Sequence, residues 1–239
     1  MKNTDTSLLV ATRNANKTRE FQGLLGDLLD PAWGVFDIAS WGSAIPEVVE
    51  DAETFYENAI KKALEVSLST GSVAMSDDSG LEVDALGGRP GVWSARYSGE
   101  GATDAKNNQK LVADLAGTPE AERGARFVCV AALAIPDTTV GRALLARAGR
   151  SFAEIGEAKP DRQGQLARVG TRIVVWFRGE VEGRIVDAPR GEHGFGYDPH
   201  FYLPELSKTM AELPAAEKNA LSHRANALQK MSAFFQGKS

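Results

Sequence analysis

Cysteine is almost absent from this chain of 239 residues, which contains only Cys129. A single cysteine cannot form an internal disulfide, so the sequence is typical of a reducing compartment, and we expect a cytoplasmic protein. Cys129 lies in the apolar run Phe127-Val128-Cys129-Val130. Burial among apolar neighbours raises the pKa of a thiol, so we interpret Cys129 as a core residue rather than a nucleophile.

Long apolar runs and excess positive charge are also missing. The first residues, 1–5, are polar, and no apolar stretch approaches the length of a membrane span or signal peptide, so we expect no membrane association. The formal net charge of −5 argues against a non-specific nucleic-acid binder, which normally has a basic surface. It leaves room for a small anionic ligand that a few local cations hold.

The remaining composition and patterning predict an α/β fold. Hydrophobic residues make up 43% and charged residues 25% of the chain, as in ordinary globular proteins. Helical and strand patterns are mixed along the chain rather than segregated. No repeat or linker marks a boundary, so we expect one domain, 1–239, with a long surface excursion at about 136–170. The expected strands are 7–11, 33–39, 73–75, 125–135, 172–177 and 181–186, and the clearest expected helices are 54–69 and 103–116, with another at the C-terminus.

The first candidate site follows the first predicted strand. A helix start there offers unpaired backbone N–H groups and a partial positive charge, which suit a phosphate. The same pattern is also typical of an ordinary capped helix with a solvated lysine. It is not a Walker A loop, which needs a different glycine spacing. Its residues are Thr12, Arg13, Asn14, Ala15, Asn16 and Lys17.

The second candidate site is the acidic sequence Asp77-Asp78-Ser79-Gly80, which we expect at the end of an apolar strand. Two adjacent carboxylates repel each other and must be solvated, paired or metal-bound. Mg²⁺ prefers such oxygen ligands together with substrate phosphates. A solvated turn is the alternative, since Asp, Ser and Gly are common turn residues. A second metal ligand can come from the preceding acidic loop, which contains Glu47, Glu50 and Glu53.

Two further candidates lie near the C-terminus. In the glycine loop 194–199, Phe195 and Tyr197 can stack on a base if they are exposed, or fill the core if they are not. Lys218, His223 and Arg224 can bind phosphate or a base carbonyl, or simply form a basic helix start at the surface. Taken together, these candidates offer cations for phosphate, carboxylates for a metal and aromatic rings for a base. A nucleotide with Mg²⁺ would satisfy all of them.

The ordered set of motifs resembles the inosine triphosphatase family, the noncanonical purine nucleoside triphosphate pyrophosphatases. The resemblance spans nearly the whole chain. Its motifs are Thr12-Arg-Asn-Ala-Asn-Lys17 with Glu20-Phe21, Thr54-Phe-Tyr-Glu-Asn-Ala59, Asp77-Asp-Ser-Gly-Leu-Glu-Val-Asp84, Gly91-Val-Trp-Ser-Ala-Arg-Tyr-Ser-Gly99, Gly194-Phe-Gly-Tyr-Asp-Pro199 and Ser222-His-Arg224. One departure is the stretch 136–170, which is longer and more charged than usual and could alter a dimer interface.

The resemblance implies an elongated mixed sheet flanked by helices, two lobes with the active-site cleft between them, and a homodimer. It implies hydrolysis of ITP, dITP and XTP to the monophosphate and pyrophosphate. Asp78 would be the general base and, with Glu50, a Mg²⁺ ligand. Nucleotide contacts would come from Thr12, Arg13, Asn14, Ala15, Asn16, Lys17, Ser79, Phe195, Gly196, Tyr197, Asp198, Lys218, His223 and Arg224.

Three alternatives remain at this point. A related pyrophosphatase of the Maf type would act on pyrimidine or modified nucleotides. A nucleotide-binding regulator would have lost turnover, although the intact acidic pair and Lys17 argue against this. A nucleic-acid-binding module is disfavoured by the acidic balance of the chain.

Overall fold

The computed structural model describes residues 7–12, 17, 18, 21, 34–38, 41, 45, 47–160 and 165–237. The chain divides into two compact units. Unit 1 comprises residues 1–78, 130–179 and 227–239, and unit 2 comprises residues 79–129 and 180–226. The strands β3 (Val73–Val83), β4 (Gly124–Pro136) and β6 (Arg172–Ile185) each contribute one end to each unit.

The sheet of unit 1 is mixed. Strand β1 (Ser7–Val10) pairs in parallel with β2 (Gly34–Asp37) and with β3, so that Val10 lies opposite Met75. The strand order continues through β4 to β6, and β5 (Leu166–Val169) pairs antiparallel with β6. Because β1 and β3 are parallel, the residues that follow Val10 leave β1 beside the part of β3 that follows Met75.

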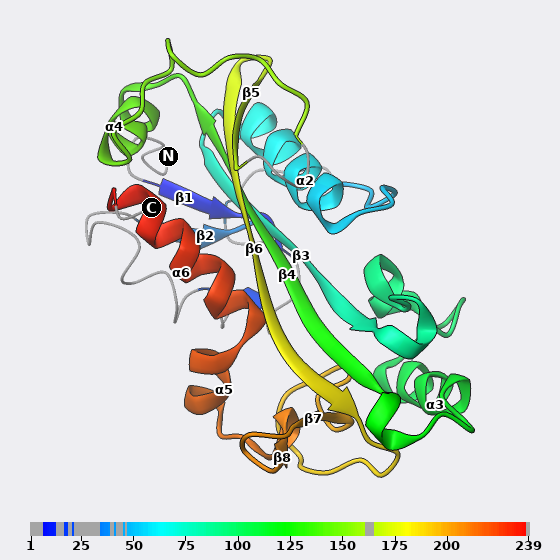
Figure 1. The fold of residues 1–239 in the computed structure, drawn as a ribbon. Coiled ribbons are helices and arrows are strands. Elements are labelled where there is room, and N and C mark those ends of the chain that lie inside the picture. The colour runs from blue at the N-terminus through cyan, green and yellow to red at the C-terminus, as the bar shows by residue number, and fades with distance from the viewer. Residues whose placement is uncertain are drawn as a thin grey trace. The chain divides into compact units, whose positions relative to one another are not determined.

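Two long helices flank the strands of unit 1. Helix α2 (Phe55–Thr70) begins where the Thr54 side chain accepts from the Glu57 N–H, and ends at Gly71, whose φ of 72° is in the left-handed region that favours glycine. Helix α6 (His223–Phe235) packs Phe234 against Phe177 of β6. In Figure 1, α2 and α6 lie on opposite sides of the strands. The predicted α/β class, with a mixed sheet flanked by helices, is therefore confirmed.

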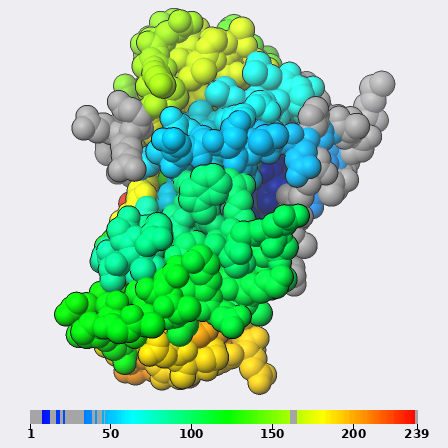
Figure 2. Space-filling model, turned by 90° about the vertical axis from the view of Figure 1, so that its right-hand side faces the viewer, coloured from blue at the N-terminus to red at the C-terminus, as the bar shows by residue number. Residues whose placement is uncertain are grey.

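Unit 2 has its own apolar core, which includes Leu81, Leu111, Phe127 and Phe201. Its surface in Figure 2 includes the green residues of helix α3, which border the yellow and orange residues of a later loop. Within this unit β6 pairs with β7, and β7 with β8, both antiparallel. The remaining elements of unit 2 are α3 (Asp104–Asp114), β7 (Phe201–Leu203), β8 (Lys208–Thr209), α5 (Ala215–Leu221) and the short 3₁₀ helices η3 (Asp84–Leu86), η4 (Gly91–Arg96), η5 (Glu120–Glu122) and η6 (Met210–Glu212).

The structure corrects two local predictions. The predicted strands 172–177 and 181–186 are one continuous strand, β6. The acidic sequence 77–80 does not follow a strand end, because β3 continues to Val83. The excursion at 136–170 contains helix α4 (Thr139–Arg147), whose Leu144 and Leu145 are buried, and strand β5. Within the described ranges, none of the helices combines the length and apolar character needed to cross a membrane.

Candidate active site

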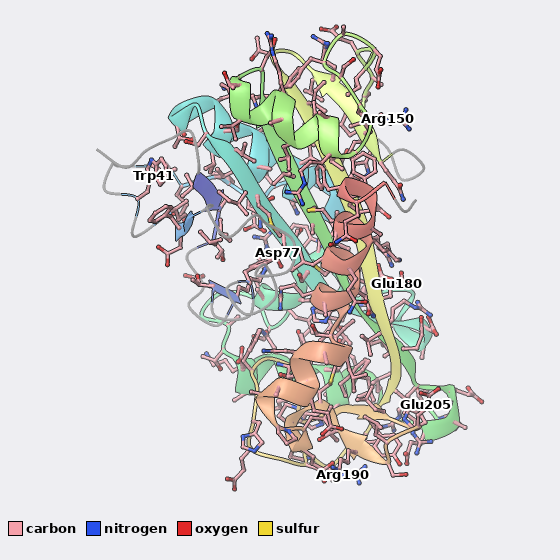
Figure 3. The ribbon with its side chains drawn as sticks, turned by 90° about the vertical axis from the view of Figure 1, so that its left-hand side faces the viewer. Trp41, Asp77, Arg150, Glu180, Arg190 and Glu205 are labelled. Atoms are coloured by element: carbon pink, nitrogen blue, oxygen red, sulfur yellow. The ribbon has the colours of Figure 1, made fainter. Side chains whose placement is uncertain are left out.

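The acidic pair lies inside the sheet rather than in a solvated turn. Only 1% of Asp77 and 6% of Asp78 is exposed, so the turn alternative is wrong. Side chains alternate along a strand, and the contacts of β3 follow this rule. The Ser76 hydroxyl donates to the Ala59 carbonyl of α2, and Asp78 also contacts α2, whereas the intervening Asp77 pairs with Lys17. Asp77, which is labelled in Figure 3, is a residue of β3.

Asp77 holds a cation that the sequence assigned to phosphate. Lys17 Nζ lies 2.9 Å from Asp77 Oδ2, and Lys62 Nζ donates to the Asp77 carbonyl at 2.6 Å. The parallel pairing of β1 with β3 accounts for the first contact. The Ala11 N–H donates to the Met75 carbonyl at 2.6 Å, so the chain leaves β1 beside the part of β3 that carries Asp77. Asp77 thus holds the Lys17 ammonium near enough for its charge to lower the pKa of Asp78.

Asp78 is a buried carboxylate with an elevated proton affinity. Burial raises the pKa of its carboxyl to about 6, against the opposing charges of Lys62 and Lys17. The negative charge of Glu50 raises the pKa further, and a 2.9 Å hydrogen bond from Asn58 Nδ2 to Asp78 Oδ2 lowers it. A carboxylate with this pKa is ionised at neutral pH and is a stronger base than an ordinary aspartate.

Glu50 is the member of the acidic loop that acts on Asp78, because its charge contributes to the Asp78 pKa. Glu50 Oε1 lies 3.0 Å from Lys62 Nζ, and 41% of the Glu50 side chain is exposed. In the described part of the chain, no group of three or more His, Cys, Asp or Glu side chains is arranged to hold a metal. Asp78 and Glu50 are two carboxylates, a donor set that fits Mg²⁺ when substrate phosphates complete its coordination.

The sequence interpretation missed two residues of this cluster, Asn58 and Lys62. They lie four residues apart on α2, so they share a face, and both are buried among the apolar residues of that helix. Polar side chains on the buried face of an amphipathic helix are a signal that could have identified them. Buried amide and ammonium groups need partners, and here Asp78 and the Asp77 carbonyl supply them.

In unit 2 the structure brings together Ser79 and Arg224, two residues predicted to contact the nucleotide. Arg224 Nη2 donates to Ser79 Oγ at 3.3 Å, and only 1% of Arg224 is exposed. The neighbouring His223 is 9% exposed, and its ring stacks on Phe127 of β4, with centroids 5.2 Å apart and planes at 19°. The surface alternative for His223 and Arg224 is therefore wrong, and Phe127 is a support that the sequence interpretation missed.

The glycine loop separates its two aromatic residues. Phe195 is partly exposed, and Lys218 Nζ lies 4.7 Å from the centre of its ring. Tyr197 is 5% exposed and donates its hydroxyl to the Ser94 carbonyl at 2.7 Å, so of the two alternatives for this ring the core-filling one is confirmed. Burial raises the pKa of the Tyr197 hydroxyl.

Asp198 organises this loop from within. Its Oδ2 accepts from Lys218 Nζ at 2.7 Å and from the Phe195 N–H at 2.8 Å. Only 4% of Asp198 and 7% of Lys218 is exposed, so Lys218 is not a surface lysine. A Cβ on Gly194 would lie 2.1 Å from Asp198 Oδ2, which explains why the loop needs glycine there.

A sequence model of the Ham1 family matches residues 8–234. This chain belongs to the Ham1 family. The resemblance noted from the motifs is thereby confirmed. The matched range includes the residues around Asp78 in unit 1 and those around Asp198 and Arg224 in unit 2.

Named relatives agree with this assignment. The dITP/XTP pyrophosphatase of Geobacter sulfurreducens is 44% identical over 223 residues, which covers 93% of each chain. The dITP/XTP pyrophosphatase of Bacillus subtilis is 40% identical over 225 residues and 94% of each chain. Among solved structures, the Staphylococcus aureus Ham1 protein has a TM-score of 0.72 at 34% identity, covering 98% of this chain and 100% of that one.

The candidate residues of this Ham1-family chain fall into two groups. Those proposed for phosphate and metal, including Lys17, Glu50 and Asp78, belong to unit 1, and those proposed for the base belong to unit 2. The chain passes from one unit to the other between Asp78 and Ser79. The residues at 13–16, namely Arg13, Asn14, Ala15 and Asn16, lie outside the described residues, so their predicted roles stay predictions.

Proposed function

We propose that this chain hydrolyses dITP, XTP and ITP to the corresponding monophosphate and pyrophosphate. Relatives named dITP/XTP pyrophosphatases that align over 93% or more of this chain support the substrate class. The observation that carries the chemistry is the buried Asp78, whose pKa of about 6 suits a general base, beside the lysines of the same cluster. A Maf-type pyrophosphatase would act on pyrimidine or modified nucleotides instead of noncanonical purine nucleotides. The match to the Ham1 family favours the purine substrates.

In this proposal Asp78 accepts a proton from a water as the water oxygen bonds to the α-phosphorus. The bond from the α-phosphorus to the bridging oxygen breaks, and pyrophosphate leaves with the bonding electron pair. Lys17 neutralises part of the charge that develops on the leaving group, and Asp77 holds Lys17 for this task. Fixed charges of this kind, aimed at developing charge, supply much of the rate enhancement in phosphoryl chemistry.

Asp78 and Glu50 would hold Mg²⁺, which supplies Lewis-acid polarisation of phosphate oxygens. Lys62 pairs with Glu50 and with the Asp77 carbonyl, so it keeps the carboxylates of the cluster from repelling one another before substrate arrives. Asn58 orients Asp78 through a hydrogen bond to one carboxylate oxygen.

Base selection follows from donor placement. Hypoxanthine and xanthine present a 6-keto acceptor where adenine presents an amino donor. Arg224 and His223 are donors in the predicted base site, so ATP would leave donors facing donors, at a cost of about 1–3 kcal/mol for each mismatch. Phe195 would contact the base with its exposed face, and Lys218 stays near its ring.

We further propose a homodimer in the cytoplasm, which light scattering and cell fractionation would test.

A panel of triphosphates tests the proposal. Purified protein is incubated with ITP, dITP, XTP, GTP, ATP, dTTP and UTP, with and without Mg²⁺, and monophosphate and pyrophosphate are measured. We expect turnover of the first three only with Mg²⁺, and ¹⁸O from labelled water in the monophosphate product. Preference for dTTP or UTP would instead identify a Maf-type activity, and binding of ITP without turnover would identify a regulator. An Asp78→Asn variant with wild-type turnover would contradict the mechanism.

A further inference from the structure

Helix α3 holds the backbone of Gly196 at both of its polar atoms. The Gly196 N–H donates to Asp104 Oδ2 at 2.8 Å, and the Gly196 carbonyl accepts from Asn108 Nδ2 at 2.9 Å. Asp104 and Asn108 lie four residues apart on α3, so they share one face, one turn apart. They lie 92 and 88 residues from Gly196 in sequence, so these are tertiary contacts. We call the two hydrogen bonds that join Asp104 and Asn108 to Gly196 the clamp.

The clamp acts on the peptide group next to Phe195. The N–H before the Phe195 side chain is bound by Asp198 inside the loop, and the N–H after it, that of Gly196, is bound by Asp104. Two carboxylates thus fix the two peptide groups that flank Phe195. Gly196 itself has a φ of 63°, in the left-handed region, and this turn brings both of its polar atoms within reach of α3.

The Asn108 amide is oriented for this contact. Its Oδ1 atom is buried and has no hydrogen-bond partner within the described residues, whereas its Nδ2 donates to Gly196. A buried amide oxygen without a partner has a free-energy cost, so Asn108 is not explained by local stability alone. A second contact of α3, from Asn107 to the Ser94 and Ala95 carbonyls, holds the neighbouring η4 segment and leaves Gly196 to the pair.

We propose that Asp104 and Asn108 are positioning residues for the nucleotide base, which act by holding Gly196 so that Phe195 presents its ring at a fixed place. The inference rests on the proposed function, because it takes Phe195 as a base contact. Neither residue contacts Lys17, Glu50 or Asp78 of unit 1 in any described contact. We therefore expect the pair to affect recognition of the base and not binding of the phosphates.

Two alanine variants, Asp104→Ala and Asn108→Ala, test the clamp. We expect each to raise KM for ITP by about three- to tenfold, the effect of losing one net hydrogen bond, and to lower the ITP-to-ATP ratio of kcat/KM. The inhibition constant of inorganic pyrophosphate, which has no base, stays at the wild-type value. Asp104→Asn keeps an acceptor oxygen and should restore most of the wild-type KM.

Two variants on the same helix serve as controls. Thr103→Ala removes the N-cap hydrogen bond to the Lys106 N–H and weakens α3 without touching Gly196, and Gln109→Ala changes an exposed side chain. Both should keep the wild-type KM. Hydrogen exchange at the Gly196 amide gives a readout independent of activity, and we expect faster exchange in Asp104→Ala than in either control.

The outcomes are distinct. Wild-type protein that hydrolyses ITP, together with clamp variants of unchanged KM and unchanged Gly196 exchange, overturns the inference and leaves the proposed function standing. Clamp variants that lose ITP turnover and pyrophosphate inhibition together also overturn it, because such loss indicates general unfolding. Wild-type protein without activity on any purine triphosphate removes the proposed function, and the inference with it.

Discussion

Lys17 Nζ lies 2.9 Å from Oδ2 of Asp77, a side chain that is only 1% exposed. The sequence suggested separate tasks for these residues: Lys17 as a phosphate-binding cation, and Asp77 as one of two adjacent carboxylates that must be solvated, paired or metal-bound. The structure joins them, because the Asp77 carboxylate, next in sequence to the candidate base Asp78, is paired with the Lys17 ammonium. The acidic pair is thus divided: Asp77 positions a lysine, and Asp78 keeps the elevated pKa.

Removing the Asp77 charge should release Lys17. We expect Asp77→Asn to lower kcat for ITP by about 10- to 100-fold, since a leaving-group charge then lacks a fixed partner. We also expect a higher inhibition constant for pyrophosphate. The matched control is Asp51→Asn, which removes the partner of Lys61 at the surface. Steady-state kinetics of both variants check this, and equal kcat values in the two would contradict it.

Lys62 should set the acidic limb of the pH profile. Its positive charge lowers the pKa of Asp78, so Lys62→Met raises that pKa and moves the acidic limb of kcat/KM to higher pH. A rise of about one unit lowers the ionised fraction of Asp78 at about pH 6.5 by roughly threefold, and we expect activity to fall by the same factor. Lys61→Met is the control, because Lys61 pairs with the exposed Asp51 instead. If the limbs of the two variants coincide with that of the wild type, Lys62 has no electrostatic role.

The elevated pKa of Asp78 should destabilise the metal-free protein at neutral pH. The pKa rises from 3.8 to about 6 on folding, so its stabilising contribution is complete below 3.8 and is lost as the pH rises through 6. Asp78→Asn removes this loss. We compare the free energy of unfolding of the variant with that of the wild type, both in the presence of a chelator. We expect the difference, variant minus wild type, to increase by on the order of 1 kcal/mol from about pH 5 to pH 8.

Urea denaturation at the two pH values measures this difference. The same Asp78→Asn variant should lose activity by at least about 100-fold, which is the usual contribution of a general base. A variant that is inactive yet more stable at neutral pH fits the assignment. A variant that loses stability equally at both pH values would show that Asp78 is a structural residue.

Removing one partner of the buried Asp198–Lys218 ion pair should destabilise unit 2 far more than removing one partner of a more exposed pair. Lys218→Met leaves a buried carboxylate without its cation, and we expect unfolding to become easier by about 3 kcal/mol. Lys110→Met breaks the partly exposed pair with Asp114 and should cost less than about 1 kcal/mol. Denaturant unfolding compares the two. Similar losses would mean that the Asp198 pair is hydrated.

Much of the local structure follows from the sequence. The capping residue Thr54 and the terminal Gly71 fix the ends of α2, because they satisfy backbone groups within a few residues. Strand β4 was predictable from its apolar run for the same local reason. The acidic pair was misplaced, because Asp, Ser and Gly favour turns unless distant partners compensate their burial. Those partners, Lys17 and Asn58, come from other elements.

The sequence by itself determined the family, since the motifs and their order are a property of the chain, and it determined which residue types are available for phosphate, metal and base. Only the tertiary structure decided their states. Whether Asp78 is a solvated turn carboxylate or a buried base depends on how much water is excluded and which charges approach, and these are set by packing. Likewise, Asp104 lies 92 residues from Gly196, and no local pattern specifies that contact.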